Sequence, residues 1–443
     1  MSVSLFKLNR IFDVIALAVA FCCVFMAFGV TQSMASTVLP SSVAFPALGI
    51  LYTSYALFNL FLSAPLVDRI GPRLAMLLAT LTYTLFEAAD VIALLQGEGA
   101  VARQMAVLFP ASVLIGAGAG VLWTAQGMYV LRCGSRETIG RYTGVFFGIM
   151  NVSNCLGPLF TALLLQASME RVTAFGILTG VGALGPLLLV YILVRPEPGN
   201  PATMIVVNEE EDKTPRLLRT SKLIFSRNML LLIPLYLLHG WEGSFNGSSL
   251  PLFIKTDSPS DDLRQKLYLS AASGAASFVA SFAVGPFTDL VGNPFMIISV
   301  DMVLHMAAML SLWLAPNAVN NLSLLYPVSI ILAVSDSILL NQTYKLIGGL
   351  FPANSTAYAA YKFHWALGVG ICLFVSKVLL GTDKVPLMYL WTPIVGVLFV
   401  SGLVGVWIVS RDIKWKEEGA SEGQHDDFDA TAVTKKHEPT DTN

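Results

Sequence analysis

Histidine and carboxylate side chains within long apolar stretches are the groups through which this 443-residue sequence could do chemistry. An ionised group in hydrocarbon costs at least about 2.5 kcal/mol, so such a residue must face protein or water. His239 and Glu242 lie three residues apart and share one face of a helix, and Asp336 lies in a later apolar stretch. These groups could bind a cation or take up a proton in a cavity, or they could form a static buried network between helices. Uncharged residues that would complete the lining of such a cavity are Gln126, Trp123 and Asn341.

The other ionisable residues of the apolar stretches are assigned a structural role. Asp301 and His305 lie one helical turn apart and are expected to pair with each other against a neighbouring helix. Glu87 and Asp90 are expected in the outer third of their helix, within reach of interfacial water. Lys362 lies within about two turns of a helix end, so its ammonium can extend to that end or approach a cavity carboxylate.

The composition is that of a membrane protein. Hydrophobic residues make up 55% of the chain and charged residues 13%, and the mean hydropathy is +0.68. A soluble domain carries about 25% charged residues. The net charge of -2 supplies no basic field for nucleic acid, which excludes that class of partner. Most of the five cysteines lie inside apolar runs, so no disulfide framework is expected.

Apolar runs that can cross a hydrocarbon layer, roughly 20 residues each, predict an all-α protein with twelve transmembrane helices. The runs are 11–31, 45–66, 74–95, 106–131, 141–165, 172–194, 228–250, 267–287, 295–315, 322–345, 357–380 and 386–410. The expected division of the chain is a six-helix bundle over 1–194, a cytoplasmic linker with a short surface helix over 195–227, a second six-helix bundle over 228–410, and a disordered acidic tail over 411–443.

Lysine and arginine are concentrated in the loops that lie on the same side of the predicted membrane as the N-terminus. Positive loops stay on the cytoplasmic side, so both termini are expected there. The chain is therefore expected to be a multi-pass protein of the plasma membrane or an endomembrane.

Two loops half a chain apart resemble each other: APLVDRIGPR at 64–73 and GPFTDLVGNP at 285–294. Each places a glycine three residues after an aspartate. Both loops fall on the cytoplasmic side, so the two halves are expected to be parallel repeats of six helices, the plan of major facilitator carriers. Further matches at one common separation are Gln126 with Gln342 and Tyr142 with Tyr358.

The first of these loops suits a tight turn that closes the cytoplasmic face. Gly71 permits the turn, and Pro72 can begin the next helix, where its missing N–H is not needed. Asp68 can accept hydrogen bonds at a helix start or pair with an arginine of a neighbouring loop. In the second half, Asp289 is expected to pair with Lys345. Alternatively, these charges only fix orientation. The expected gate residues are Asp68, Arg69, Gly71, Arg73, Asp289 and Lys345.

Four longer strings carry a family resemblance: APLVDRIGPRLAMLLATLTYTLFEAADVI at 64–92, FPASVLIGAGAGVLWTAQGMYV at 109–130, AVSDSILLNQTYKLIGGLF at 333–351 and AAYKFHWALGVGICLFVS at 359–376. They resemble the Unc-ninety-three-like family of the major facilitator superfamily, in which the second string reads Gly-x-Gly-x-x-x-x-Trp-Thr-x-Gln-Gly-x-Tyr. The first loop resembles the superfamily pattern Gly-x-Leu-x-Asp-Arg-x-Gly-x-Arg, with Ala64 at the first glycine. The resemblance implies the major facilitator fold. It does not imply one function, since this family includes potassium-channel regulators and receptor-trafficking proteins.

No motif indicates an enzyme, because the sequence has no Gly-Lys-Ser phosphate loop, no His-Glu-x-x-His and no Cys-x-x-Cys. Neither a cofactor nor a metal site is expected. Two functions remain. The first is a secondary transporter that moves a small solute or cation by alternating access, with or without proton coupling. The second is a non-transporting regulator or trafficking partner of an ion channel, such as a potassium channel, or of a receptor.

Overall fold

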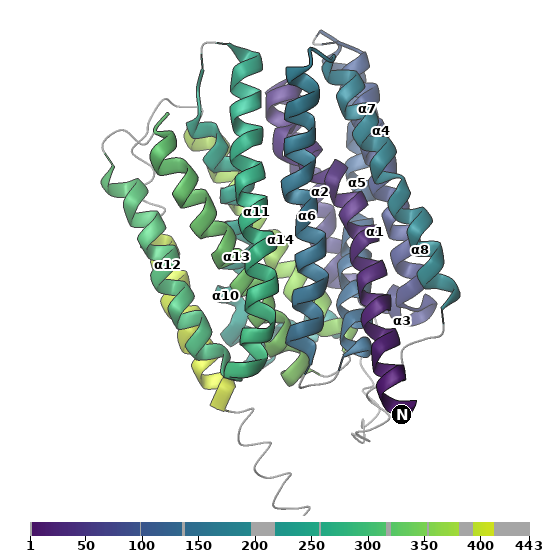
Figure 1. Cartoon of the computed structure of the whole chain (residues 1–443), viewed down its shortest axis with the longest axis vertical. Coiled ribbons are helices and arrows are strands. Elements are labelled where there is room, and N and C mark those ends of the chain that lie inside the picture. The colour runs from purple at the N-terminus through teal and green to yellow at the C-terminus, as the bar shows by residue number, and fades with distance from the viewer. Residues whose placement is uncertain are drawn as a thin grey trace, which may run out of the picture.

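The computed structural model describes residues 2–97, 99–134, 138–195, 218–256, 258–315, 320–351, 354–380 and 393–411. The regular secondary structure of these ranges is helical throughout. In Figure 1 the long helices stand side by side, with α1 to α8 on one side of the molecule and α10 to α14 on the other. We call the first set the N-terminal group, and the second set together with the helix over 393–411 the C-terminal group.

The helices of the N-terminal group are α1 (Ser2–Val38), α2 (Ser41–Phe61), α3 (Ser63–Ile70), α4 (Pro72–Leu95), α5 (Val101–Cys133), α6 (Ile139–Gln166), α7 (Arg171–Gly182) and α8 (Leu184–Val194). The helices that follow are α9 (Arg219–Ile224), α10 (Arg227–Ser244), the π-helical η3 (Phe245–Ser249), the 3-10 helical η4 (Leu250–Phe253), α11 (Pro259–Val291), α12 (Pro294–Leu314), α13 (Leu322–Leu350) and α14 (Ser355–Leu380). The short α9 lies near the end of the predicted linker, most of which is outside the described residues.

Eleven helical segments of the described chain are long and apolar enough to cross a membrane. They coincide with eleven of the predicted spans, so the multi-pass prediction is confirmed. The predicted span over 228–250 is not among the eleven. It falls on α10 and η3, where the α-helix carries His239 and Glu242 and ends at Ser244. The chain then continues as a wider π turn, so this segment is more polar and less regular than the others.

The two loops with an aspartate and a glycine adopt the predicted tight turns. Gly71 has φ 80° and Gly292 has φ 69°, a region that favours glycine because it lacks Cβ. Pro72 and Pro294 follow as the first residues of α4 and α12. In the second loop, the side chain of Asn293 also accepts a hydrogen bond from the backbone N–H of Phe295 and so caps α12.

Both turns lie at the same end of the molecule as the start of α1. Because successive long helices alternate in direction, this end also holds the end of α8 and the start of α10. Figure 1 shows it at the bottom, where the N-terminus is marked. We call it the motif end, after Asp68 and Gly71, and we call the other the opposite end.

The N-terminal and C-terminal groups meet most closely along α6 and α11, which lie next to each other in Figure 1. A Cβ on Gly144 would lie 2.9 Å from the Cα of Gly285, so the two backbones touch at this point. Asn151 donates a hydrogen bond of 3.1 Å to the hydroxyl of Ser281 along the same seam. Small residues at this seam therefore let the two helices pack closely.

Candidate functional site

A cavity of about 290 Å³ lies between the two groups of helices. Its walls come from α1, α2, α4, α5 and α6 on one side and from α10, η3, α11, α13 and α14 on the other. On α13 the lining residues are Ala333, Asp336 and Leu340, near the middle of a helix that runs from Leu322 to Leu350. The cavity therefore lies about halfway along the molecule, where both groups contribute.

The wall from the N-terminal group is rich in aromatic rings. The ring of Trp123 lies 5.2 Å from that of Phe25 and stacks on that of Phe147 at 6.3 Å between centroids. Tyr83 continues this wall, with its ring 5.4 Å from that of Phe25. Such a surface favours a solute that has an apolar or planar face.

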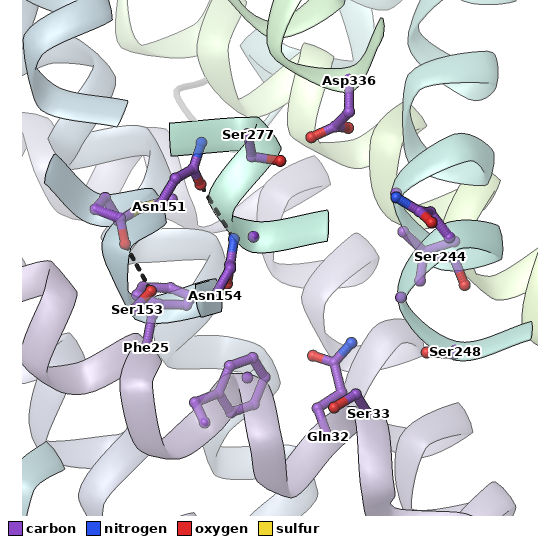
Figure 2. Close-up of a pocket in the computed structure, with 18 of the residues that line it drawn as sticks. Phe25, Gln32, Ser33, Asn151, Ser153, Asn154, Ser244, Ser248, Ser277 and Asp336 are labelled. Carbon is purple, nitrogen blue, oxygen red and sulfur yellow. Dashed lines mark hydrogen bonds between the residues drawn. The ribbon is translucent and has the colours of Figure 1, made fainter. Parts of the chain in front are cut away.

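A second wall is lined by amides and hydroxyls, which Figure 2 shows facing the same space. Asn154 donates a hydrogen bond of 3.1 Å to Asn151, and both lie on α6. Hydroxyls of α11 lie beside these amides, and hydroxyls of α10 and η3 lie across the cavity. The labelled members in Figure 2 are Ser244, Ser248 and Ser277. The cavity can therefore offer both hydrogen bonds and ring contacts, as sites for small polar molecules do.

His239 and Asp336 meet at this cavity, as the sequence predicted for a shared site. The Nε2 of His239 lies 3.3 Å from the Oδ1 of Asp336, and its Nδ1 lies 3.0 Å from the hydroxyl of Tyr361. The imidazole is 3% exposed, whereas the Asp336 side chain is 32% exposed and points into the open space. Each ring nitrogen thus has a partner, and the carboxylate remains accessible to a ligand.

Lys362 also lines the cavity, although the sequence assigned it a structural role. Its Nζ lies over three rings, at 4.5 Å from the centroid of Trp123, 4.8 Å from Tyr361 and 5.0 Å from Trp365. The residue is 3% exposed, so the ammonium does not extend to the helix end. Aromatic faces stabilise this cation in the absence of water.

Glu242 lies away from the cavity, contrary to its predicted place in the lining. Its Oε1 is 2.9 Å from the Nδ1 of His305 on α12, and both residues are fully buried. His305 also meets the hydroxyl of Ser335 at 3.3 Å. The expected pairing of Asp301 with His305 is therefore wrong, because the imidazole of His305 bonds to Glu242 instead. Asp301 instead lies beside Ser335, the hydroxyl that also meets His305.

The buried acids of α4 also differ from expectation. Glu87 is 1% and Asp90 is 2% exposed, so neither reaches interfacial water. A Cβ on Gly182 of α7 would collide with the carboxylate of Glu87, which shows how closely α7 covers this acid. The two oxygens of Glu87 have no hydrogen-bond partner among the described residues.

Gln126 and Asn341 are buried on the motif-end side of the cavity and do not line it. The hydroxyl of Tyr344 donates a hydrogen bond of 2.8 Å to the Oε1 of Gln126, which links α13 to α5. Asn341 donates to the backbone oxygen of Ser337 within α13 at 2.9 Å. The ring of Tyr358 packs against Gly127 and lies 5.3 Å from that of Tyr344. These buried residues form a layer between the cavity and the motif end.

Asp68 forms a contact across the two groups of helices at the motif end. Its Oδ1 accepts a hydrogen bond of 2.7 Å from the hydroxyl of Ser355, the first residue of α14. A carboxylate at a helix N-terminus is stabilised by the unpaired backbone N–H groups there. Arg69 is exposed, and the side chain of Asp289 lies outside the described residues. Lys345 donates a hydrogen bond of 2.6 Å to the backbone oxygen of Thr288, the residue before Asp289.

Arg73 acts within the N-terminal group. It donates to the backbone oxygens of Leu193, at 3.1 Å, and of Arg195. Arg195 in turn lies 3.0 Å from the carboxylate of Asp13, which also pairs with Arg10 at 3.3 Å. The hydrogen bond to Asp13 raises the pKa of the Arg195 guanidinium, because it stabilises the charged form. These contacts tie α1, α4 and α8 together at the motif end.

Sequence reasoning missed several residues of the site and of the motif end. Asn151 and Asn154 lie three residues apart within an apolar run, which is the signal that could have identified them. Tyr361 carries no such signal, since a tyrosine in an apolar helix is common. Asp13 stands three residues after Arg10 near the start of the first run and was overlooked. Among the described residues, no group of three or more His, Cys, Asp or Glu is arranged to hold a metal ion.

Comparison with solved structures places this architecture among known folds. The chain is similar to a variant of the E. coli fucose:proton symporter FucP, with a TM-score of 0.62, 14% identity, and coverage of 88% of this chain and 98% of that one. A second structure, the major facilitator superfamily transporter FucP in the outward conformation, gives a TM-score of 0.59 at 13% identity and covers 90% of this chain and 99% of the other. These similarities show the major facilitator fold.

Several relatives are similar along most of their length. Protein unc-93 homolog A of Bos taurus is 26% identical over 417 residues, which cover 83% of this chain and 87% of the relative. UNC93-like protein MFSD11 of Xenopus tropicalis is 25% identical over 428 residues, and the match covers 84% of this chain and 91% of the relative. UNC93-like protein 3 of Arabidopsis thaliana is 26% identical, with 82% and 80% covered.

A family model described as ion channel regulatory protein UNC-93 matches residues 37–400. That range includes the Asp68 turn, Lys362 with its three rings, and the cavity lining except for the residues of α1. The chain is therefore a multi-pass membrane protein with the major facilitator fold, and it belongs to the UNC-93 family.

Proposed function

We propose that the protein is a secondary transporter that carries a small polar solute or cation by alternating access. The observation that supports this proposal best is the cavity itself, which lies between two groups of helices and contains an accessible carboxylate, Asp336. In this proposal the chain has twelve spans in two parallel six-helix repeats, and both termini are cytoplasmic. The linker over 195–227 connects the repeats, and the tail over 411–443 follows the second.

The contacts at the motif end support an assignment of this structure to a state closed toward the cytoplasm. Asp68 and Ser355 join the two groups there, and the pair of Tyr344 and Gln126 joins them again nearer the cavity. The cavity lining instead includes Gln32 and Ser248, which lie closer to the opposite end of their helices. In the alternate state these motif-end contacts would break, and the cavity would open to the cytoplasm.

The cavity chemistry supports coupling to a proton or another cation. His239 and Asp336 can share a proton across 3.3 Å, and a ligand that displaces the imidazole would meet a free carboxylate. The neighbouring ammonium of Lys362 supplies the opposite charge. A solute with hydrogen-bonding groups on one side and an apolar face on the other fits the two walls.

The second candidate is a regulator or trafficking partner of an ion channel or receptor. It is supported by the description of the family model, which names ion channel regulation. Such a protein would need the fold and a docking face toward its partner, but no solute flux. In that case Asp336 would contribute to folding only.

Flux measured with purified protein in liposomes separates these two functions. A panel of monovalent cations, amino acids and monosaccharides, including fucose because the structural relative is a fucose:proton symporter, is tested with and without a pH gradient. We expect saturable uptake of at least one solute, and the uptake is expected to disappear in Asp336→Asn. Absence of flux for the whole panel, together with a partner-channel current that scales with the amount of protein at the surface, would favour the regulator.

A further inference from the structure

Four polar residues form a separate cluster inside the C-terminal group. Glu242 on α10, Asp301 and His305 on α12, and Ser335 on α13 are each 0% exposed. None of them lines the cavity. Aromatic rings enclose the imidazole of His305, with Phe399 at 5.0 Å and Trp241 at 6.4 Å between centroids. The cluster is therefore shielded from water in this conformation.

The hydrogen bonds within the cluster leave several buried atoms without a partner. The Nδ1 of His305 serves both Glu242 and Ser335. Among the described residues, the Nε2 of His305 and the Oε2 of Glu242 have no hydrogen-bond partner, and Asp301 has only the hydroxyl of Ser335, which it shares with Glu242 and His305. A buried polar atom without a partner is costly, so such a set needs a function or a ligand to explain it. The ligand must be small enough to enter a site that is fully enclosed.

The charge of the cluster identifies that ligand. With both carboxylates ionised and a neutral imidazole, the cluster would carry two negative charges in a part of the membrane that does not tolerate them. The nearby groups do not cancel this charge: His239 pairs with Asp336 in the cavity, and the ammonium of Lys362 lies in its cage of rings. His364 on α14 bonds to its own backbone at Ala360, and the basic residues Arg227 and Lys345 lie toward the motif-end ends of α10 and α13. Neutrality therefore requires that Glu242, Asp301 and His305 hold two protons among them.

The cluster shares two helices with the cavity. Glu242 lies three residues after His239 on α10, and Ser335 directly precedes Asp336 on α13. A movement of α10 against α13 therefore alters both the cavity pair and the buried cluster. The backbone is irregular at this point, since the α-helix ends at Ser244 and a π turn spans Phe245–Ser249. Such π turns occur frequently at functional sites.

We propose that Glu242, Asp301 and His305 form a proton-binding site, distinct from the His239 and Asp336 pair, that releases one proton when α10 moves relative to α12 and α13. The released proton leaves from a carboxyl group or from the imidazolium, and the remaining proton stays shared between His305 and a carboxylate. The inference rests on the proposed carrier function only where it links release of the proton to movement of a solute. Proton binding itself requires no solute.

Infrared difference spectroscopy of the full-length protein in lipid nanodiscs tests this site without any solute. We expect the carbonyl band of a protonated carboxylic acid to be lost as the pH is raised. Asp301→Asn should remove this change, and Glu242→Gln should remove it or displace its midpoint by about one pH unit. Both substitutions imitate the protonated acid in shape, and two separate variants guard against loss of folding in one of them.

Glu87→Gln is the matched control, because Glu87 is an equally buried acid in the N-terminal group with no histidine among its hydrogen-bond partners. It should leave the pH-dependent band unchanged. The proposal fails if Asp301→Asn and Glu242→Gln both retain the band change of the wild type. If both variants retain the band change and the protein takes up a solute, the proton-binding site is rejected and the carrier function stands. If the variants lose the band change but the protein takes up no solute, the proton-binding site stands and the carrier function is rejected.

Discussion

The two halves of the molecule bury acids at comparable places but surround them differently. On α4, which follows the Gly71 turn, Glu87 and Asp90 are packed under α7. On α12, which follows the Gly292 turn, Asp301 lies beside His305, which bonds to Glu242. The first site thus contains only acids, and the second combines acids with a base.

In the proton cycle proposed above, this difference favours the site in the C-terminal group. Among the described residues, Glu87 has no basic side chain as a hydrogen-bond partner, so a proton bound there has no second position to occupy. An imidazole beside two carboxyl groups offers another position for the proton, so the charge can be rearranged within the site. The C-terminal group also contributes His239, Asp336 and Lys362 to the cavity, whereas the N-terminal group contributes mainly rings and amides. The chemistry of this protein is therefore concentrated in its C-terminal half.

The largest expected effect is on uptake driven by a gradient. Asp336→Asn should reduce it by at least about tenfold, because the amide cannot exchange a proton or neutralise a cation. Glu87→Gln should change it by less than about twofold, since that acid does not line the cavity. Both rates are measured per molecule of protein in liposomes. Equal losses in the two variants would contradict the asymmetry between the halves.

A contrast in stability is expected next. His305→Leu leaves Glu242 without its buried hydrogen-bond partner and should lower the free energy of unfolding by about 1–3 kcal/mol. Glu87→Met removes two oxygens that have no hydrogen-bond partner among the described residues, so it should be neutral or stabilising. Thermal unfolding in detergent measures both. If Glu87→Met lowers the free energy of unfolding more than His305→Leu does, Glu87 makes a stronger stabilising interaction than the bond between His305 and Glu242.

The seam between the halves should be more sensitive than the periphery. Gly144→Ala places a Cβ 2.9 Å from Gly285 and should cost about 1–3 kcal/mol, because two backbones must separate. Gly176→Ala on α7 is the control: its Cβ has no atom within 4 Å, and alanine favours the helix by about 0.5–1 kcal/mol. The midpoint of thermal unfolding should therefore fall in the first variant and rise or stay constant in the second.

The smallest effect is expected at the motif end. Ser355→Ala removes the hydrogen bond to Asp68 and should weaken the closed state by about 0.5–1.5 kcal/mol. Asp68→Asn should have a similar effect, and Arg69→Gln a smaller one, because among the described residues Asp68 has a hydrogen bond across the two groups and Arg69 has none. The reaction rate of Cys133, which is 8% exposed, with a thiol reagent reports opening in a protein whose other cysteines are replaced. An unchanged rate in Asp68→Asn would indicate that the loop only fixes orientation.

Much of the fold could be predicted from the sequence, because length and hydropathy are properties of each segment by itself. A run of about 20 apolar residues crosses a bilayer whichever helices surround it. The turns at Gly71 and Gly292 were equally local, since a positive φ depends on the residue itself. The segment over 228–250 departed from the pattern where polar residues and a π turn interrupt the helix.

The composition of the site depended on the tertiary structure. His239 and Glu242 are three residues apart, which places them within about 60° of each other around α10. That small angle is enough to direct His239 toward α13 and the cavity and Glu242 toward His305 on α12. Lys362 likewise entered the cavity because rings from α5 and α14 surround its ammonium. The sequence determined which groups must be buried, but only the packing of helices around each face decided which partner each group would have.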